Sequence, residues 1–215
     1  MKKSIVISIV LCFILLLTSC APKSQSMNIN LYYANKDNSQ ILLEQREIQV
    51  TKKDSIPKIA LEELLKGPQT SDLNSNIPKD TKVLNIEIEE KIAKVNFSED
   101  FSRFPGSMAE SFAIISVVNT LTDLEEIEQV EIFVDGKELI APSGEPYGVL
   151  EKYDIDKINK ELNTETVTLY FPDKEAMYLE PEQREISKGE SIAFEIVMEL
   201  MEGPESPELT PPAIP

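Results

Sequence analysis

The chain has 215 residues with a formal net charge of −17 at neutral pH, contains no histidine, and carries its two cysteines at Cys12 and Cys20. Without histidine the chain lacks the commonest general base and the commonest metal ligand, and we expect no enzymatic activity and no cofactor. Its negative charge repels nucleic acid and favours only a basic surface on a partner, so we expect no nucleic-acid partner.

The first residues, 1–19, have the organisation of a bacterial lipoprotein signal peptide. Two lysines precede an apolar run over residues 5–17, which is too short to span a bilayer comfortably. The run closes with Leu17-Thr18-Ser19-Cys20, a lipobox in which small residues precede the cysteine that receives the lipid. An ordinary secretory signal and an uncleaved anchor are the alternative interpretations of the same run.

Cleavage before Cys20 would make this residue, once diacylated, the first residue of the mature chain. Cys12 would leave with the signal, so that no thiol remains for catalysis, for zinc or for a disulfide. We therefore expect lipidation at Cys20, residues 20–27 as a short tether, and a location on the extracytoplasmic face of the cell membrane.

The remainder of the chain contains an internal repeat. The segment Glu44-Gln45-Arg46-Glu47-Ile48 recurs unchanged as Glu182-Gln183-Arg184-Glu185-Ile186, 138 residues later. A repeat with so long a period indicates two copies of one domain rather than a solenoid. We expect a first domain over residues 28–140, a linker over 141–165, and the N-terminal part of a second domain over 166–215.

The first copy is expected to begin with a hairpin and a helix. Residues 29–33 alternate apolar and polar side chains, which is typical of a half-buried strand, and residues 41–50 return as a second strand. Asp54 or Ser55 then caps a helix that ends at Gly67, and a proline follows.

A second hairpin, a second helix and a last strand follow. Residues 83–88 and 92–97 are expected to form two strands joined by a tight connection, and residues 130–134 form the last strand. Ser107 and Glu110 have the spacing of a capping box that would open the second helix. This order predicts an α+β fold in which one mixed sheet carries two helices on one face.

Four charged residues are the candidate interaction site. Arg46-Glu47 and Arg184-Glu185 are identical in the two copies, at strand positions that we expect to be exposed. Such positions predict a shared ion pair or a docking edge, while a purely structural role is the simpler interpretation.

Two acidic clusters are weaker candidates. Glu151, Asp154 and Asp156 could suggest calcium, but the glycine and the final glutamate of a calcium-binding loop are absent, which favours a solvated linker. The pair Glu99-Asp100 near Arg103 favours exposed charges rather than catalysis.

Aromatic residues also occur at matching places in the two copies. Tyr32-Tyr33 and Tyr170-Phe171 could stack on a glycan. Because alternation along a strand buries one residue of each pair, packing in the core is the favoured interpretation.

These features together resemble the GerMN domain of sporulation and germination lipoproteins, in which two such domains follow a lipobox. The resemblance lies in the order of the motifs, in the duplication and in the lipobox. The matching segments are Leu31-Tyr32-Tyr33, Leu64-Leu65-Lys66-Gly67-Pro68, Val95-Asn96-Phe97-Ser98, Ser107-Met108-Ala109-Glu110 and Ile132-Phe133-Val134-Asp135-Gly136-Lys137.

The resemblance implies a βαββαβ-like domain and a non-enzymatic module that assembles or scaffolds complexes in the envelope of a spore-forming bacterium. It implies envelope or sporulation-complex proteins as partners, with the membrane contacted through the N-terminal lipid. A protein that binds or remodels the peptidoglycan of the spore cortex is the alternative, and a solute-binding lipoprotein is a third that the short chain disfavours. The second copy lacks the later elements of the first, so we expect it to be loosely ordered, or to be completed in a longer protein.

Overall fold

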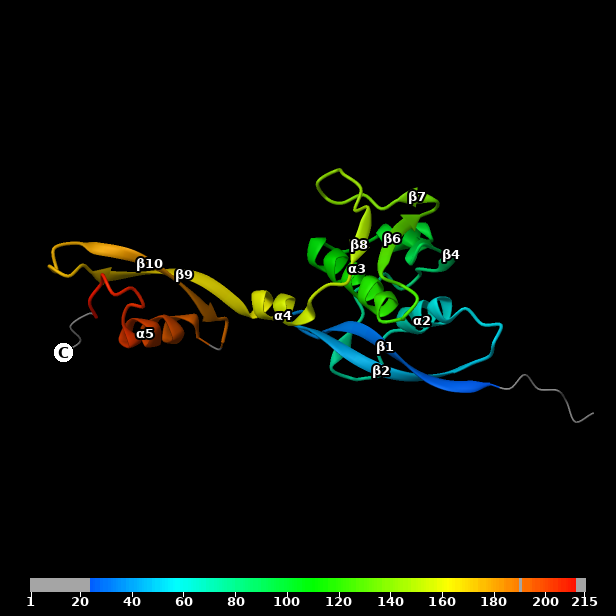
Figure 1. The fold of residues 1–215 in the computed structure, drawn as a ribbon, viewed down its shortest axis with the longest axis horizontal. Coiled ribbons are helices and arrows are strands. Elements are labelled where there is room, and N and C mark those ends of the chain that lie inside the picture. Colours follow the sequence, from blue (N-terminus) through cyan, green and yellow to red (C-terminus); the bar gives the residue numbers. More distant parts are fainter. Residues whose placement is uncertain (1–23, 190, 212–215) are drawn as a thin grey trace, which may run out of the picture.

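The computed structural model describes residues 24–189 and 191–211, which form two folded units placed end to end with helix α4 between them (Figure 1). The expected signal peptide and Cys20 lie outside the described residues. The elements in chain order are β1 (Gln25–Asn35), β2 (Ile41–Val50), α2 (Ile56–Leu65), β3 (Leu73–Asn74), β4 (Val83–Glu89), β5 (Ile92–Phe97), the 3-10 helix η1 (Glu99–Ser102), α3 (Ser107–Thr122), β6 (Gln129–Val134), β7 (Lys137–Glu138), β8 (Val149–Glu151), α4 (Ile155–Asn163), β9 (Thr164–Pro172), β10 (Leu179–Ser187) and α5 (Ile192–Glu202).

The first unit is built as three layers (Figure 1). Strands β2, β1 and β3 form an antiparallel sheet in that order, and helices α2 and α3 pack against it. Beyond the helices lies a second sheet of order β4-β5-β6-β7, in which β5 and β6 are parallel and β8 also pairs with β6. The core lies between the layers, and its largest buried side chains include Leu31, Tyr33, Leu61, Leu64, Phe97, Phe101, Ile114 and Leu121.

The α+β class is confirmed, but the strands divide between two sheets where the sequence predicted one. Helix α3 explains the division, because all of its residues from Phe112 to Leu121 are buried, including the polar Ser116, Asn119 and Thr120. A helix that is buried around its whole circumference needs cover on more than one side. Strands β1 and β6 provide that cover from opposite sheets.

Helix α2 begins at one of the two predicted caps and ends at Leu65, two residues before the predicted Gly67. Ser55 is its N-cap, and the Ser55 hydroxyl accepts a hydrogen bond from the Lys58 N–H at 3.4 Å. Gly67 follows the last turn with a φ of +83°, a left-handed conformation that glycine adopts without the strain of a side chain. This turn returns the chain to the first sheet, where β3 pairs with the end of β1.

The predicted capping box at Ser107 is wrong. Helix α3 already begins at Ser107, its N-cap is Gly106, and no side chain caps it. The Ser107 hydroxyl therefore lies one position too far along the helix to act as the cap. Glu110 instead accepts a hydrogen bond from the Tyr147 hydroxyl at 3.1 Å, which ties the chain before β8 to the first turn of α3.

Residues 141–165 join the two units, but they contain strand β8 and helix α4 and are not the solvated linker that the sequence suggests (Figure 1). Strand β8 joins the second sheet, and α4 packs on the first unit. Asn119 fixes the start of this segment, because its amide exchanges two hydrogen bonds of 2.9 Å with the backbone of Tyr153. The sequence suggests a solvated segment because the charged residues of α4 lie on its exposed side. Its apolar side covers a buried cluster formed by Tyr32, Ala34, Ile41, Phe112 and Ile115.

The second unit reproduces the start of the first. Strands β9 and β10 pair as an antiparallel hairpin and α5 packs on it, as the repeat predicts. The pairing of Asn35 with Leu73 has its counterpart in a bridge between Asp173 and Leu209. The hairpin buries Leu169, Phe171 and Ile186, whereas α5 has no buried residue. Within the described residues, nothing covers the outer side of α5.

Candidate functional site

Arg46 and Arg184, which the sequence places at exposed positions, are both buried, with exposed fractions of 6% and 8%. The correction follows from the alternation of side chains along β2. Ile48 and Val50 are buried, and Arg46 shares their face of the strand, so its side chain points toward α2 rather than into solvent. Glu47 lies on the opposite face and is exposed.

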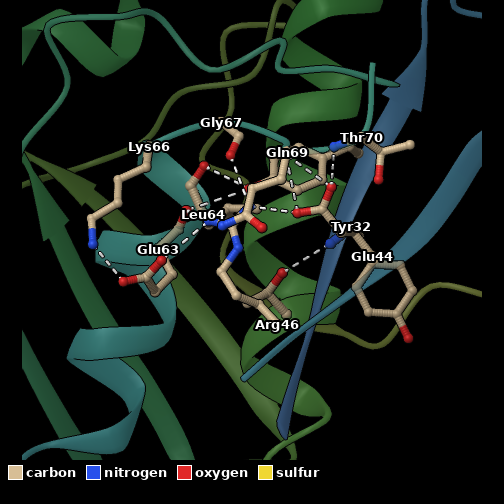
Figure 2. A network of polar contacts seen from close by, with 11 residues as sticks. Tyr32, Glu44, Arg46, Glu63, Leu64, Lys66, Gly67, Gln69 and Thr70 are labelled. Atoms are coloured by element: carbon tan, nitrogen blue, oxygen red, sulfur yellow. Dashed lines mark hydrogen bonds and ion pairs between the residues drawn. The ribbon is translucent and has the colours of Figure 1, made fainter. Parts of the chain in front are cut away.

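The Arg46 guanidinium lies at the C-terminal end of α2, between two carboxylates (Figure 2). Its Nη1 donates to the Glu63 carboxylate at 3.2 Å and to the Glu63 carbonyl oxygen at 2.8 Å. Its Nη2 donates to the Glu44 carboxylate at 2.5 Å and to the Gly67 carbonyl oxygen at 3.0 Å. A cation at this end satisfies carbonyl groups that have no partner within the helix, and it complements the helix dipole.

Glu44 extends these contacts to the chain after the Gly67 turn. Its carboxylate accepts hydrogen bonds from the backbone N–H groups of Gln69 at 2.9 Å and Thr70 at 2.8 Å (Figure 2). We refer to Glu44, Arg46 and Glu63 as the first clamp. The first clamp fastens the end of α2 and the turn that follows it to strand β2.

Electrostatic interactions keep all three groups of the first clamp charged. Burial opposes the ionisation of Glu44, but hydrogen bonds from Thr70 and Arg46 outweigh it and hold the pKa of Glu44 below its ordinary value. Burial also opposes the ionisation of Glu63, while Lys66 and Arg46 lower the pKa of Glu63. The pKa of Arg46 is raised, because its two carboxylate partners outweigh the effect of burial.

The second unit contains the same arrangement at Glu182, Arg184 and Glu199, which we refer to as the second clamp. Arg184 donates from Nε to Glu182 at 2.7 Å, from Nη1 to Glu199 at 3.0 Å, and from Nη2 to the Gly203 carbonyl oxygen at 2.9 Å. Glu182 accepts two backbone N–H groups after the Gly-Pro turn, at 3.1 and 3.0 Å. The three partner residues correspond to those of Arg46, but the bonds differ in detail. Arg46 Nε is buried without a partner within the described residues, whereas Arg184 Nε bonds Glu182, and Arg184 also pairs with Glu205 at 3.5 Å.

Glu47 and Glu185 do not pair with the arginines beside them. Glu47 accepts a hydrogen bond from the Ser26 hydroxyl on β1. Glu185 forms an ion pair with Lys160 of α4 at 2.7 Å. The four candidate residues are therefore not brought together as one site, and each arginine and each glutamate serves a different contact.

Sequence reasoning missed two carboxylates that organise the first unit, Glu44 and Asp123. The signal for Glu44 was available, because it shares the buried face of β2. Asp123 accepts hydrogen bonds from the Asn30 amide and the Tyr32 hydroxyl, both at 2.8 Å, and pairs with Lys152. No local pattern predicts this second cluster, since Asn30 precedes Asp123 by 93 residues.

The two acidic clusters lie where structural roles explain them. Arg103 forms an ion pair with Asp100 at 2.6 Å and a longer one with Glu99 at 3.7 Å. Asp154 caps α4, where its carboxylate accepts the Lys157 N–H at 3.0 Å. In the part of the chain that the structure describes, no group of acidic side chains is arranged to hold a metal ion.

The aromatic candidates differ in exposure. Tyr33 and Phe171 are buried in their units. Tyr32 is buried as well, with 7% of its surface exposed, because α4 covers that side of β1. Packing in the core, the favoured interpretation, therefore holds for both residues of the first pair and for Phe171. Tyr170 follows the alternation and is 56% exposed.

Both clamps have a structural role, because their charged groups hold a helix end and the following turn to a strand. Each arginine is neutralised by carboxylates, and the carboxylates in turn accept backbone N–H groups, so neither clamp holds an unoccupied acid or base. The exposed parts of the two units are strand edges, turns and helix faces. Within residues 24–189 and 191–211, no helix is long and apolar enough to cross a membrane.

A family model described as Germane, sporulation and spore germination, matches residues 30–140, which is more than half of the chain. Among solved structures, the chain is similar to the first GerMN domain of the sporulation protein GerM from Bacillus subtilis, with 27% identity over 60% of this chain and 99% of that one, at a TM-score of 0.49. It is also similar to the tandem GerMN domains of GerM from Bacillus subtilis (21% identity, 85% and 70% of the two chains, TM-score 0.49). A third similar structure is a candidate lipoprotein from Clostridium perfringens (26% identity, 61% and 91%, TM-score 0.43). No curated protein matches the chain.

Proposed function

We propose, because the chain belongs to the Germane family of sporulation and spore germination, that it is a lipid-anchored, non-enzymatic module that assembles protein complexes at the cell envelope. The matched region covers most of the first unit, and the second unit repeats the start of that unit. The partners would be envelope or sporulation-complex proteins that carry basic surfaces, since the chain has a net charge of −17.

The duplicated clamp is the observation that carries this proposal. In each unit the buried charged groups are occupied by one another and by the backbone. An enzyme instead keeps at least one acid, base or nucleophile free to reach a substrate. A fold that is repeated together with its internal contacts, and that presents strand edges and helix faces, is suited to bind other proteins.

Lipidation at Cys20 would hold the first unit close to the membrane. Strand β1 starts at Gln25, so five Cα–Cα steps separate it from Cys20. At about 3.5 Å for each step, the tether spans at most roughly 18 Å. The first unit would then lie against the outer face of the membrane.

Glycan binding is a second candidate, which exposed aromatic side chains of the second unit favour. Tyr170 and Tyr178 are 56% and 69% exposed. Such side chains combine an apolar ring with a hydroxyl that can reach a hydrogen-bond partner, which suits a sugar surface. The peptidoglycan of the spore cortex would be the ligand in that case.

Complementation in a spore-forming host tests the proposal. Cells without the gene would receive the wild-type chain or Cys20→Ala, and spore yield, germination and cross-linked proteins from sporulating membranes would be measured. The wild-type chain should restore sporulation and cross-link to envelope proteins, and Cys20→Ala should do neither. Full restoration by Cys20→Ala would contradict the anchored role. Recovery of muropeptides without protein partners would favour glycan binding.

A further inference from the structure

Strand β2 is an edge of its sheet, and its backbone groups alternate in direction. The Asn35 N–H donates to the Gln40 carbonyl oxygen at 2.9 Å, which places this pair among the hydrogen-bonded pairs of the antiparallel ladder. Pairs alternate along such a ladder. The odd-numbered residues of β2 therefore direct their N–H and C=O groups away from β1, and these residues are Ile41, Leu43, Gln45, Glu47 and Gln49.

One of these outward positions is already paired by an amide. The Ile41 N–H donates to Asn159 Oδ1 at 2.7 Å, and Asn159 Nδ2 donates to the Ile41 carbonyl oxygen at 2.9 Å. The Asn159 side chain thus makes the two bonds that a residue of a neighbouring strand would make. Beyond it, the segment from Leu43 to Gln49 has no strand beside it within the described residues.

A pocket lies beside the free edge, next to the end that Asn159 covers. It has a volume of about 490 Å³, and Tyr32, Leu43, Tyr153 and Ile155 supply its apolar lining. Leu43 is 47% exposed. An apolar side chain from an added strand opposite Leu43 would have this pocket within reach.

The charges near the edge indicate the chemistry of the added strand. Asp154 and Asp156 line the pocket together with Lys152, whose charge is paired with Asp123, and Glu47 is exposed on the same face of β2, four residues beyond Leu43. A lysine or arginine opposite Glu47 would form a favourable cross-strand pair. A second copy of this chain would instead bring another acidic edge and a net charge of −17, which disfavours self-association.

The corresponding edge of the second unit is obstructed. Pro181 of β10 occupies the position of Leu43, and proline has no N–H to donate. Glu185, which corresponds to Glu47, is paired with Lys160. Strand β4, at an edge of the other sheet of the first unit, has an irregular register between Val83 and Asn85, which interrupts regular pairing.

We propose that the β2 edge from Leu43 to Gln49 accepts an extended segment of a partner protein as an additional strand. The segment carries an apolar residue that enters the pocket at Leu43 and a basic residue that faces Glu47. Because side chains on one face of a strand recur at every second position, these two residues stand four positions apart. The inference rests on the proposed assembly role and names the surface and the kind of partner that it would use.

The test uses the soluble chain from Ala21 onward and a fluorescein-labelled nine-residue peptide of threonine and valine, with one leucine and one lysine four positions apart. Fluorescence anisotropy should show binding of this peptide. A peptide of the same composition, with leucine and lysine three positions apart, presents them on opposite faces and should bind more weakly. Absence of binding by the first peptide, or equal binding by both, would overturn the proposal.

Variants of the chain locate the binding. Leu43→Pro removes one outward N–H, should fold because Pro181 is accommodated at the equivalent position, and should weaken binding roughly tenfold. Glu47→Lys should weaken it about two- to fivefold, and Glu185→Lys, the matched control, should leave it unchanged. Unchanged binding by both Leu43→Pro and Glu47→Lys would overturn the proposal.

Two further measurements cover the cases in which Leu43→Pro does not fold or the chain associates with itself. If circular dichroism shows that Leu43→Pro is unfolded, a peptide N-methylated on its edge-facing side replaces that variant and should lose binding. If sedimentation shows a dimer of the wild-type chain that Glu47→Lys alters, the occupant is a second copy and the proposal is wrong. Failure of the peptide test leaves the assembly role standing, because complementation decides that role separately.

Discussion

Replacing Arg46 with methionine should destabilise the first unit strongly at neutral pH. The side chain is only 6% exposed, and it contacts two carboxylates and two carbonyl oxygens. Glu63 would keep Lys66 as a partner, whereas Glu44 would lose the one cation that pairs with it among the described residues. Removing one partner of a buried ion pair costs about 3 to 5 kcal/mol, because the other charge stays buried. This is a large share of the roughly 5 to 15 kcal/mol that holds a domain folded.

The loss of unfolding free energy in Arg46→Met should depend on pH, and the pKa of Glu44 determines whether it grows or shrinks as the pH falls. In the wild-type chain this pKa lies below the ordinary value of 4.5, so Glu44 contributes stability above that value, and the contribution is lost as the pH falls through the folded-state pKa. In Arg46→Met the carboxylate can escape its unpaired state by taking a proton. The difference between the variant and the wild type should therefore shrink between pH 7 and pH 4.

Urea unfolding followed by circular dichroism measures both effects, and hydrogen exchange assigns them to the first unit. Arg184→Met is the matched control in the second unit, and it should lose less stability because Glu199 and Glu205 are partly or largely exposed. The double variant Glu44→Gln/Arg46→Met should recover part of the loss. A loss below about 1 kcal/mol at pH 7, the range of an exposed pair, would refute the argument, as would an equal loss at both pH values.

Three further variants test other features of the chain. Cys20→Ala should move the protein from the membrane fraction to soluble or signal-retaining forms, and unchanged labelling with a fatty acid would contradict lipidation. Gly67→Ala should cost about 1 to 2 kcal/mol in urea unfolding, because φ is +83° and a side chain there is strained although it meets no neighbour within 4 Å; a gain in stability would count against this. Leu61→Ala should cost about 2 to 5 kcal/mol because Leu61 is fully buried, whereas Val197→Ala, at the equivalent position of α5, is 51% exposed and should cost no more than about 0.5 kcal/mol. Equal losses would contradict the exposed position of Val197.

Local patterns predicted the elements that local physics determines. The cap at Ser55 and the turn at Gly67 depend on a hydroxyl and on a residue without Cβ, and both are visible in the sequence. The hairpins follow from alternation in the same way. Because the segment is repeated, the sequence also predicted a hairpin and a helix in the second unit, where β9, β10 and α5 occur at the corresponding positions.

The errors arose where distant segments decide burial. The sequence treats the α4 segment as solvated because it is rich in charge, but three apolar residues at helical spacing cover Tyr32 and its neighbours. Arg46 was placed in solvent because it is charged, although alternation with Ile48 predicted the buried face. A charged residue at a buried strand position predicts partners nearby, and those partners were Glu44 on the same strand and Glu63 on the helix that follows.

The two copies separate what the repeated segment determines from what its surroundings determine. The identical segment from Glu44 to Ile48 forms the same clamp in both units, because every partner of the clamp lies within one hairpin, one helix and one turn. The exposed face of the segment differs between the units. Glu185 pairs with Lys160, whereas Glu47 is exposed on the edge strand β2. The clamp can therefore account for the fold of both copies but not for a difference in binding. A binding function that belongs to one copy has to depend on unrepeated residues such as Leu43 and Asn159.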